Sequence, residues 1–169
     1  TAIILLLLSG RLSAIDPAQY NAGIFEAALQ NGDNAREALI AGLRNTGAWL
    51  ETADPVSLLV PDRMGETLYT PHNSAADNYP FMILSSFYTD QAFFKSTARR
   101  MLYNELRYAT LPNGMPVSYD IQTKETSIFR NDVMFGASEY VKDGLIPVTE
   151  LLGASVWSER MVNLIDLII

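Results

Sequence analysis

The chain has 169 residues, of which 49% are hydrophobic, and carries a net charge of −7. This length suits one domain with a sizeable core, and the acidic balance without any basic patch argues against nucleic acid as a partner. The sequence has no Cys, which excludes disulfides, thiol catalysis and zinc–thiolate sites. His72 is the single histidine, so we expect no multi-histidine metal site and no bound metal.

Residues 2–8 form the apolar run AIILLLL, which is followed by Ser9, Gly10 and Ala14. The run is too short to cross a bilayer, which takes about 20 apolar residues, so we expect no stable membrane span. It is typical of the apolar part of a secretory signal peptide that lacks its basic start. A buried helix or strand is the alternative. We interpret residues 1–15 as a truncated signal peptide and the protein as exported, to the periplasm, the cell surface or the medium.

The first half of the chain predicts two helices joined by a tight turn. Asp16 and Pro17 are typical of a helix start, and a helix is expected over about residues 17–29. Asn-Gly-Asp at residues 31–33 predicts the turn, and a second helix is expected over about residues 34–51. One face of this second helix carries Leu39, Leu43, Thr46 and Leu50.

A long connection over residues 52–75, with several prolines, is expected to be ordered because its apolar content is high. A third helix is expected over about residues 76–88, with Asp77 or Asn78 as its N-cap and Pro80 in its first turn. It should end at Thr89-Asp90, where a fourth helix begins and continues to about residue 108. The side chains expected to face inward on the fourth helix are Phe94, Thr97, Ala98, Met101 and Leu102.

The last third of the chain predicts a small β-hairpin followed by two more helices. Pro-Asn-Gly at residues 112–114 is a turn signal, and partial alternation over residues 115–123 indicates the hairpin. A fifth helix is expected over about residues 131–152, weakened near residues 142–144 and Pro147. Residues 153–155 predict another short turn, and a sixth helix begins near Val156.

The three short turns lie about 60 residues apart, which predicts an array of helical hairpins separated by long connections. The stretches Ser138–Met161 and Asp77–Phe94 resemble hairpins of the six-hairpin glycosidase superfamily, whose members are α/α toroids. The resemblance implies an all-α fold over residues 16–169, with three helical hairpins forming part of a toroid and long loops on one face. Because that family has six hairpins, it also implies that a missing C-terminal half of the same protein completes the ring.

The resemblance implies a carbohydrate-active protein, in which carboxylate general acid/base residues and water cleave glycosidic bonds without a cofactor. A glycoside hydrolase is the expected class, ahead of a polysaccharide lyase, and the expected ligand is carbohydrate. The alternative is a non-catalytic helical scaffold or a glycan-binding domain of an exported system. The sequence contains no P-loop and no G-x-G-x-x-G, so a nucleotide is not expected.

In a ring of hairpins the long connections lie on one face, so the starts of the inner helices should meet at one mouth. This places Tyr20, residues 77–79 and residues 130–132 near one another. Asp77 and Asp132 are therefore the catalytic candidates, as a carboxylate pair that protonates the leaving group and activates water. Each could instead be a plain N-cap.

The substrate-binding candidates are polar or aromatic residues near the same mouth: His72, Asn73, Tyr79, Arg63, Arg130 and Tyr119. An arginine could hold a substrate carboxylate through two parallel hydrogen bonds, and a tyrosine could stack on a sugar ring. The alternatives are loop capping for His72, ion pairs with Asp62 or Asp132 for the arginines, and core packing for the tyrosines. The pairs Arg99-Arg100 and Glu159-Arg160 are interpreted as solvated outer faces.

Overall fold

The computed structural model describes residues 22–127 and 132–169. The expected signal peptide, Tyr20 and Arg130 lie outside these residues. The chain divides into two compact units, residues 1–37 and 38–169, which are described separately. The described part of the first unit is helical, and the second unit contains the core.

The described residues form five helices and a small three-stranded sheet, and the chain is mostly helical, at 70%. Three of these helices are made of consecutive segments. Their bounds, in chain order, are α2 (Ala22–Thr52), η2 (Pro71–Asn78) with α3 (Tyr79–Thr89), α4 (Gln91–Lys95) with α5 (Thr97–Tyr108), α6 (Asp132–Glu139) with η3 (Tyr140–Leu145) and α7 (Ile146–Leu152), and α8 (Val156–Ile168). The strands are β1 (Leu68–Tyr69), β2 (Ser118–Asp120) and β3 (Glu125–Ser127).

The turn predicted at residues 31–33 is wrong, because α2 runs through it as one helix of 31 residues. Gly32 costs a helix about 1 kcal/mol relative to Ala but does not end it. The neighbouring polar side chains instead support the helix: Gln30 donates a hydrogen bond to Asn34 at 3.0 Å, and Arg36 lies 3.9 Å from Asp33. The structure therefore has two helical hairpins and a long first helix rather than three hairpins.

The buried face of α2 also differs from the predicted one. Leu39 and Leu43 are each 41% exposed, whereas Gly42 and Thr46 are buried. The absence of a side chain at Gly42 lets Ser85 of α3 approach, and the hydroxyl oxygens of Thr46 and Ser85 lie 2.9 Å apart. The second half of α2 thus packs on α3 through small residues.

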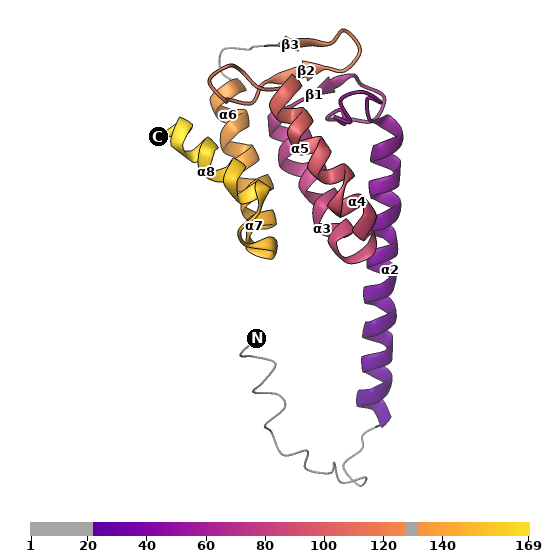
Figure 1. Ribbon diagram of the computed structural model, residues 1–169. Coiled ribbons are helices and arrows are strands. Elements are labelled where there is room, and N and C mark those ends of the chain that lie inside the picture. The colour runs from indigo at the N-terminus through magenta and orange to yellow at the C-terminus, as the bar shows by residue number, and fades with distance from the viewer. Residues whose placement is uncertain (1–21, 128–131) are drawn as a thin grey trace. The chain divides into compact units, whose positions relative to one another are not determined.

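The turn predicted near Asp90 is confirmed. α3 ends at Thr89, and the Asp90 carboxylate accepts hydrogen bonds from the backbone N–H groups of Ala92 and Phe93, which starts α4. Tyr79 at the start of α3 donates to the Ala98 carbonyl on the returning helix, so the two helices form a hairpin (Figure 1). Four of the five predicted inward residues are buried on this helix: Phe94, Ala98, Met101 and Leu102.

The turn predicted at residues 153–155 is confirmed as well. α7 ends at Leu152, and Ser155 and Ser158 form a capping box that starts α8. α8 then packs back against η3, α7 and α6 (Figure 1). Trp157 on α8 is buried and stacks on Phe94, with ring centroids 5.7 Å apart, so the second hairpin is joined to the first.

The first helix of each hairpin contains a π-helical segment that is followed by a proline, Pro80 or Pro147. In each segment the N–H before the proline bonds to the carbonyl five residues back, from Tyr79 to Ser74 and from Ile146 to Val141. A proline inside a helix clashes with the carbonyl four residues earlier, and a wider turn ahead of it relieves that clash. The predicted weakness near Pro147 therefore takes the form of a π-helix.

The expected small β-hairpin is present, but it lies further along the chain and has a third strand. β2 pairs with β3 and with β1, antiparallel in both cases, in the order β1-β2-β3. The turn between β2 and β3 uses Lys124, which has a φ of 65°. The sheet lies at the end of the helices where α5 ends and α6 begins (Figure 1). A toroid is not established by two hairpins and this sheet.

Candidate functional site

The two π-helical segments pack directly against each other, and Gly144 makes this possible. A Cβ atom at Gly144 would lie 2.8 Å from the carbonyl oxygen of Ala75 and 3.2 Å from the Pro80 ring. Gly136 allows a similar approach about two turns earlier, since its Cβ would lie 3.0 Å from Pro71. η2 and the helix of α6 and η3 therefore run side by side in the same direction, as the starts of two neighbouring inner helices were expected to do.

This packing places Asp77 of η2 among the charged residues of η3. The carboxyl group is partly desolvated although the residue is exposed, and this partial burial is the main cause that raises the pKa of Asp77 above its usual value. The negative charges of Asp143 and Glu139 raise the pKa of Asp77 further, and His72 and Lys142 oppose them. A carboxyl group whose pKa is raised by burial and by nearby negative charge is a candidate general acid.

Lys142 pairs with two carboxylates, those of Glu139 at the end of α6 and Asp143 on η3. Its Nζ lies 2.7 Å from Glu139 Oε1 and 3.1 Å from Asp143 Oδ2. These two hydrogen bonds raise the pKa of Lys142, with Glu139 contributing more than Asp143. As carboxylates, Glu139 and Asp143 could stabilise positive charge that develops on a substrate or activate a water molecule.

His72 lies at the start of η2, and its imidazole is half-buried. The ring centroid of His72 is 5.9 Å from that of Phe135 on α6. Its Nδ1 is buried and has no hydrogen-bond partner among the described residues, which is unusual for a buried polar atom. The structure thus brings together His72 and Asp77, two of the residues that the sequence singles out.

Other expected site residues are not brought to this cluster. Asn73 is held at the start of η2, where its backbone N–H donates to Thr70 Oγ1. Arg63 is exposed on the loop before β1, with Nη1 3.9 Å from Glu66. Asp132 is the first residue of α6, and Arg130 lies outside the described residues. The carboxylates that raise the pKa of Asp77 are Asp143 and Glu139, so these two residues join Asp77 as candidates.

Tyr79 is a core residue in the structure and not part of an open site. It is 5% exposed, its hydroxyl donates to the Ala98 carbonyl at 2.6 Å, and it accepts a hydrogen bond from Trp157 Nε1 at 2.8 Å. Asn78, one of the two predicted N-caps, precedes α3, but its side chain makes no capping hydrogen bond. Thr70 caps the helix, which begins at Pro71, so Asp77 is freed from that role.

Tyr119 lies on β2 and lines an open hollow of about 670 Å³ in the second unit. The other lining residues are Val56, Arg107, Tyr108, Lys124, Glu125 and Thr126. None of the residues of the Asp77 cluster lines this hollow. The structure therefore separates the substrate-binding candidate Tyr119 from the carboxylates.

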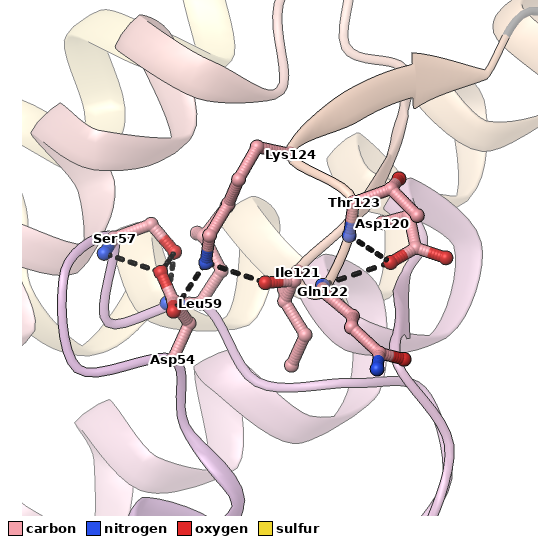
Figure 2. A network of polar contacts seen from close by, with 8 residues as sticks. All are labelled: Asp54, Ser57, Leu59, Asp120, Ile121, Gln122, Thr123 and Lys124. Carbon is pink, nitrogen blue, oxygen red and sulfur yellow. Dashed lines mark hydrogen bonds and ion pairs between the residues drawn. The ribbon is translucent and has the colours of Figure 1, made fainter.

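A polar network fixes one wall of this hollow (Figure 2). Lys124 Nζ donates to Asp54 Oδ1 at 2.5 Å and to the Ile121 carbonyl, which ties the loop after α2 to the β2–β3 turn. Asp54 also accepts hydrogen bonds from the backbone N–H and the hydroxyl of Ser57, both at 2.7 Å. Asp120 accepts from the N–H groups of Gln122 and Thr123, which shapes the turn that presents Lys124.

Sequence reasoning missed the charged residues of η3. Glu139 and Asp143 are four residues apart, and this spacing could have placed them on one helical face. The sequence does not show that Gly144 packs on Ala75. This contact brings the helical face that carries Glu139 and Asp143 to Asp77. The cationic residues of the hollow, Arg107 and Lys124, were missed because they lie on different elements.

Two further features are considered for the described residues, a metal site and a membrane-spanning helix. No group of three or more His, Asp or Glu side chains in residues 22–127 and 132–169 is arranged to hold a metal ion. No helix in the part of the chain that the structure describes is long and apolar enough to cross a membrane.

Comparison of the chain with protein-family models, with curated proteins and with solved structures gave no match.

Proposed function

We propose that this protein acts on carbohydrate and cleaves glycosidic bonds by general acid/base catalysis, with Asp77 as the acid. The observation that carries the proposal is the raised pKa of Asp77, which partial burial, Asp143 and Glu139 produce together. Glycosidic cleavage needs one carboxyl group that holds a proton and one that stays ionised. Glu139 and Asp143, which both pair with Lys142, are the candidates for the second carboxylate.

The repeated hairpins support the same proposal. Each contains a π-helix followed by a proline and an α-helix, and each turns at a capped position into a returning helix. The two π-helices run side by side, which is the arrangement of inner helices in an α/α toroid. On this basis we propose a partial toroid related to the six-hairpin glycosidases. Export, which suits an enzyme for external glycans, remains part of the proposal.

The experiment is a cleavage assay on a broad panel of polysaccharides and oligosaccharides. Wild-type protein should release reducing ends from at least one of them, and Asp77→Asn should lower the rate by a factor of about 100 or more, since general acid catalysis contributes about 10²–10⁴-fold. Asp166→Asn on α8 is the matched control, because Asp166 is exposed and lies outside the cluster. Equal rates for the two variants would remove Asp77 from the mechanism.

The second candidate function is glycan binding without cleavage. It is favoured by the hollow beside Tyr119, which has aromatic and charged lining residues and contains none of the cluster carboxylates. If the wild type binds glycans but cleaves none of the panel, this second function replaces the first.

A further inference from the structure

The hollow lined by Arg107, Tyr108, Tyr119, Lys124 and Glu125 has the composition of a small-ligand site rather than of a packing defect. It is open, it measures about 670 Å³, and it lies where three parts of the second unit meet: the loop after α2, the end of α5 and the β2–β3 hairpin. Two of its walls are linked by the ion pair of Lys124 with the buried Asp54. The hollow is therefore held in shape before any ligand arrives.

The charged groups of the hollow offer both donors and acceptors. Arg107 is exposed and forms no ion pair within the described residues, and its guanidinium lies 5.2 Å from the centre of the Tyr108 ring. When the face of a guanidinium lies against an aromatic ring, the N–H groups at its edge can still donate hydrogen bonds in the guanidinium plane. Lys124 uses two of its three N–H groups on Asp54 and Ile121, which leaves one to donate. Glu125 is exposed and supplies acceptor oxygens.

The aromatic rings give the hollow a flat apolar surface. Tyr108 is half-buried at the end of α5, and its ring centroid lies 6.0 Å from that of Tyr119. A ligand that fits must combine an apolar ring face with groups that both donate and accept hydrogen bonds. Sugar rings have this combination, because their C–H groups form one face and their hydroxyls do both. A simple anion would use Arg107 and Lys124 but would be repelled by Glu125.

We propose that this hollow is a saccharide-binding site, separate from the Asp77 cluster, in which Arg107 binds ring hydroxyls of a neutral sugar unit lying beside Tyr108. The proposal rests on the proposed function in one respect, that the ligand is carbohydrate. It extends that function by giving the protein a second place to hold a glycan chain while the carboxylates act, or to retain one without cleaving it.

The test is direct binding by isothermal titration calorimetry of short cello-, xylo-, malto- and galacto-oligosaccharides, with an oligogalacturonate and inorganic phosphate as anionic probes. At least one neutral oligosaccharide should bind to the wild type, and Arg107→Gln should weaken that binding about tenfold or more, since hydrogen bonds to charged groups are the stronger ones. Arg100→Gln is the matched control, because Arg100 is exposed on the same helix but lies outside the hollow, and it should bind within twofold of the wild type.

Three outcomes would overturn the proposal: no neutral oligosaccharide binds, the two arginine variants weaken binding equally, or an anionic probe binds tenfold more tightly than every neutral one. Circular dichroism of each variant separates lost binding from lost folding, and Tyr108→Leu, expected to weaken binding as well, gives an independent readout. The proposed cleavage by Asp77 and the proposed binding by Arg107 can fail independently of each other. Cleavage that depends on Asp77 can stand when binding does not depend on Arg107, and the reverse holds too.

Discussion

At the scale of single residues, the most constrained polar contact is the buried pair of Glu105 and Arg160. Each side chain is 3% exposed, and Arg160 bonds Glu105 through Nε at 3.2 Å and Nη2 at 2.7 Å. Arg160 also donates to the Gly114 carbonyl, and Thr110 donates to Glu105. The pair thus joins α5, α8 and the loop between α5 and β2. The interpretation of Arg160 as a solvated residue was wrong, because a buried partner lies 55 positions away in the sequence.

Arg160→Met should destabilise the protein strongly, because it leaves the Glu105 carboxylate buried without its partner. Breaking a buried pair by removing one member costs about 3–5 kcal/mol. Arg100→Met is the control, since Arg100 is exposed, and it should change the free energy of unfolding by no more than about 0.5 kcal/mol. Urea denaturation of both variants measures this. Similar midpoints for the two variants would contradict the buried ion pair.

The ionisation of Asp54 should make the free energy of unfolding of the protein depend on pH. Burial alone would raise the pKa of Asp54, but the hydrogen bonds from Lys124 and Ser57 outweigh it and lower the pKa. A lowered folded-state pKa means that the contribution is present above the unfolded-state pKa, about 3.9, and is lost as pH falls through the folded-state value.

Asp54→Asn should therefore cost about 1–3 kcal/mol at neutral pH, the range for hydrogen bonds to a charged group. The difference from the wild type should shrink between about pH 4 and pH 2, where the wild-type carboxylate takes up its proton. Chemical denaturation at several pH values gives this difference. A difference that stays constant down to pH 2 would show that the carboxylate charge contributes nothing to stability.

At the scale of elements, the packing of η2 on η3 positions the candidate site. Substitutions at Gly144 and Gly32 test at which of these positions the helix packing requires a glycine. Gly144→Ala should destabilise the protein by about 1–3 kcal/mol, because the added Cβ would meet the Ala75 carbonyl and the Tyr140 ring at 2.8 and 2.9 Å. It should also lower any Asp77-dependent cleavage, since η2 and η3 must separate to make room.

Gly32→Ala is the matching change in a helix without such a contact, since no atom lies within 4 Å of the added Cβ. It should raise the helical signal in circular dichroism and stabilise α2 by about 0.5–1 kcal/mol, the helix preference of Ala over Gly. A loss of helical signal would show that residues 31–33 form the turn that the sequence first indicated.

The elements also show what could be read from the sequence. The turns at Asp90 and at residues 153–155 were predictable because each is encoded locally, by a cap residue or a glycine. The turn at residues 31–33 was not real, because Asn, Gly and Asp are tolerated in a helix whose polar side chains bond along it. An irregularity near Pro147 was predictable, but the π-helix before Pro80 was not, and the packing of the two π-helices depends on contacts across about 70 residues of sequence.

The residues of the candidate site could likewise be predicted from the sequence only in part. Asp77 and His72 could be chosen from their polar setting, and the structure places both on η2. Glu139 and Asp143 could not, because only the three-dimensional packing brings them near Asp77. Tyr79 was misassigned because a tyrosine at a helix start can be either a sugar platform or a core residue, and its buried partners Ala98 and Trp157 decide for the core.

At the scale of the whole molecule, stability should be unevenly distributed along the chain. Every side chain from residue 23 to residue 41 is exposed, whereas α3, α5 and η3 contribute fully buried residues. A helix without tertiary packing is marginal even at this length. Amide hydrogen exchange should therefore be fast over residues 26–37 and slowest in the helices that carry Met82, Leu102 and Tyr140. Equal protection in both regions would contradict this distribution.

The central claim for the whole molecule is that Asp77 acts as the proton donor in glycosidic cleavage, with its pKa raised in part by Asp143. The most direct test is the pH dependence of kcat/KM on the best substrate from the panel, for the wild type, Asp143→Asn and the control Asp166→Asn. Removal of the Asp143 charge lowers the pKa of Asp77, so the alkaline limb of the profile should move to lower pH in Asp143→Asn and stay in place in Asp166→Asn. A limb that does not move in Asp143→Asn, or a wild type that cleaves no glycan, would contradict the account.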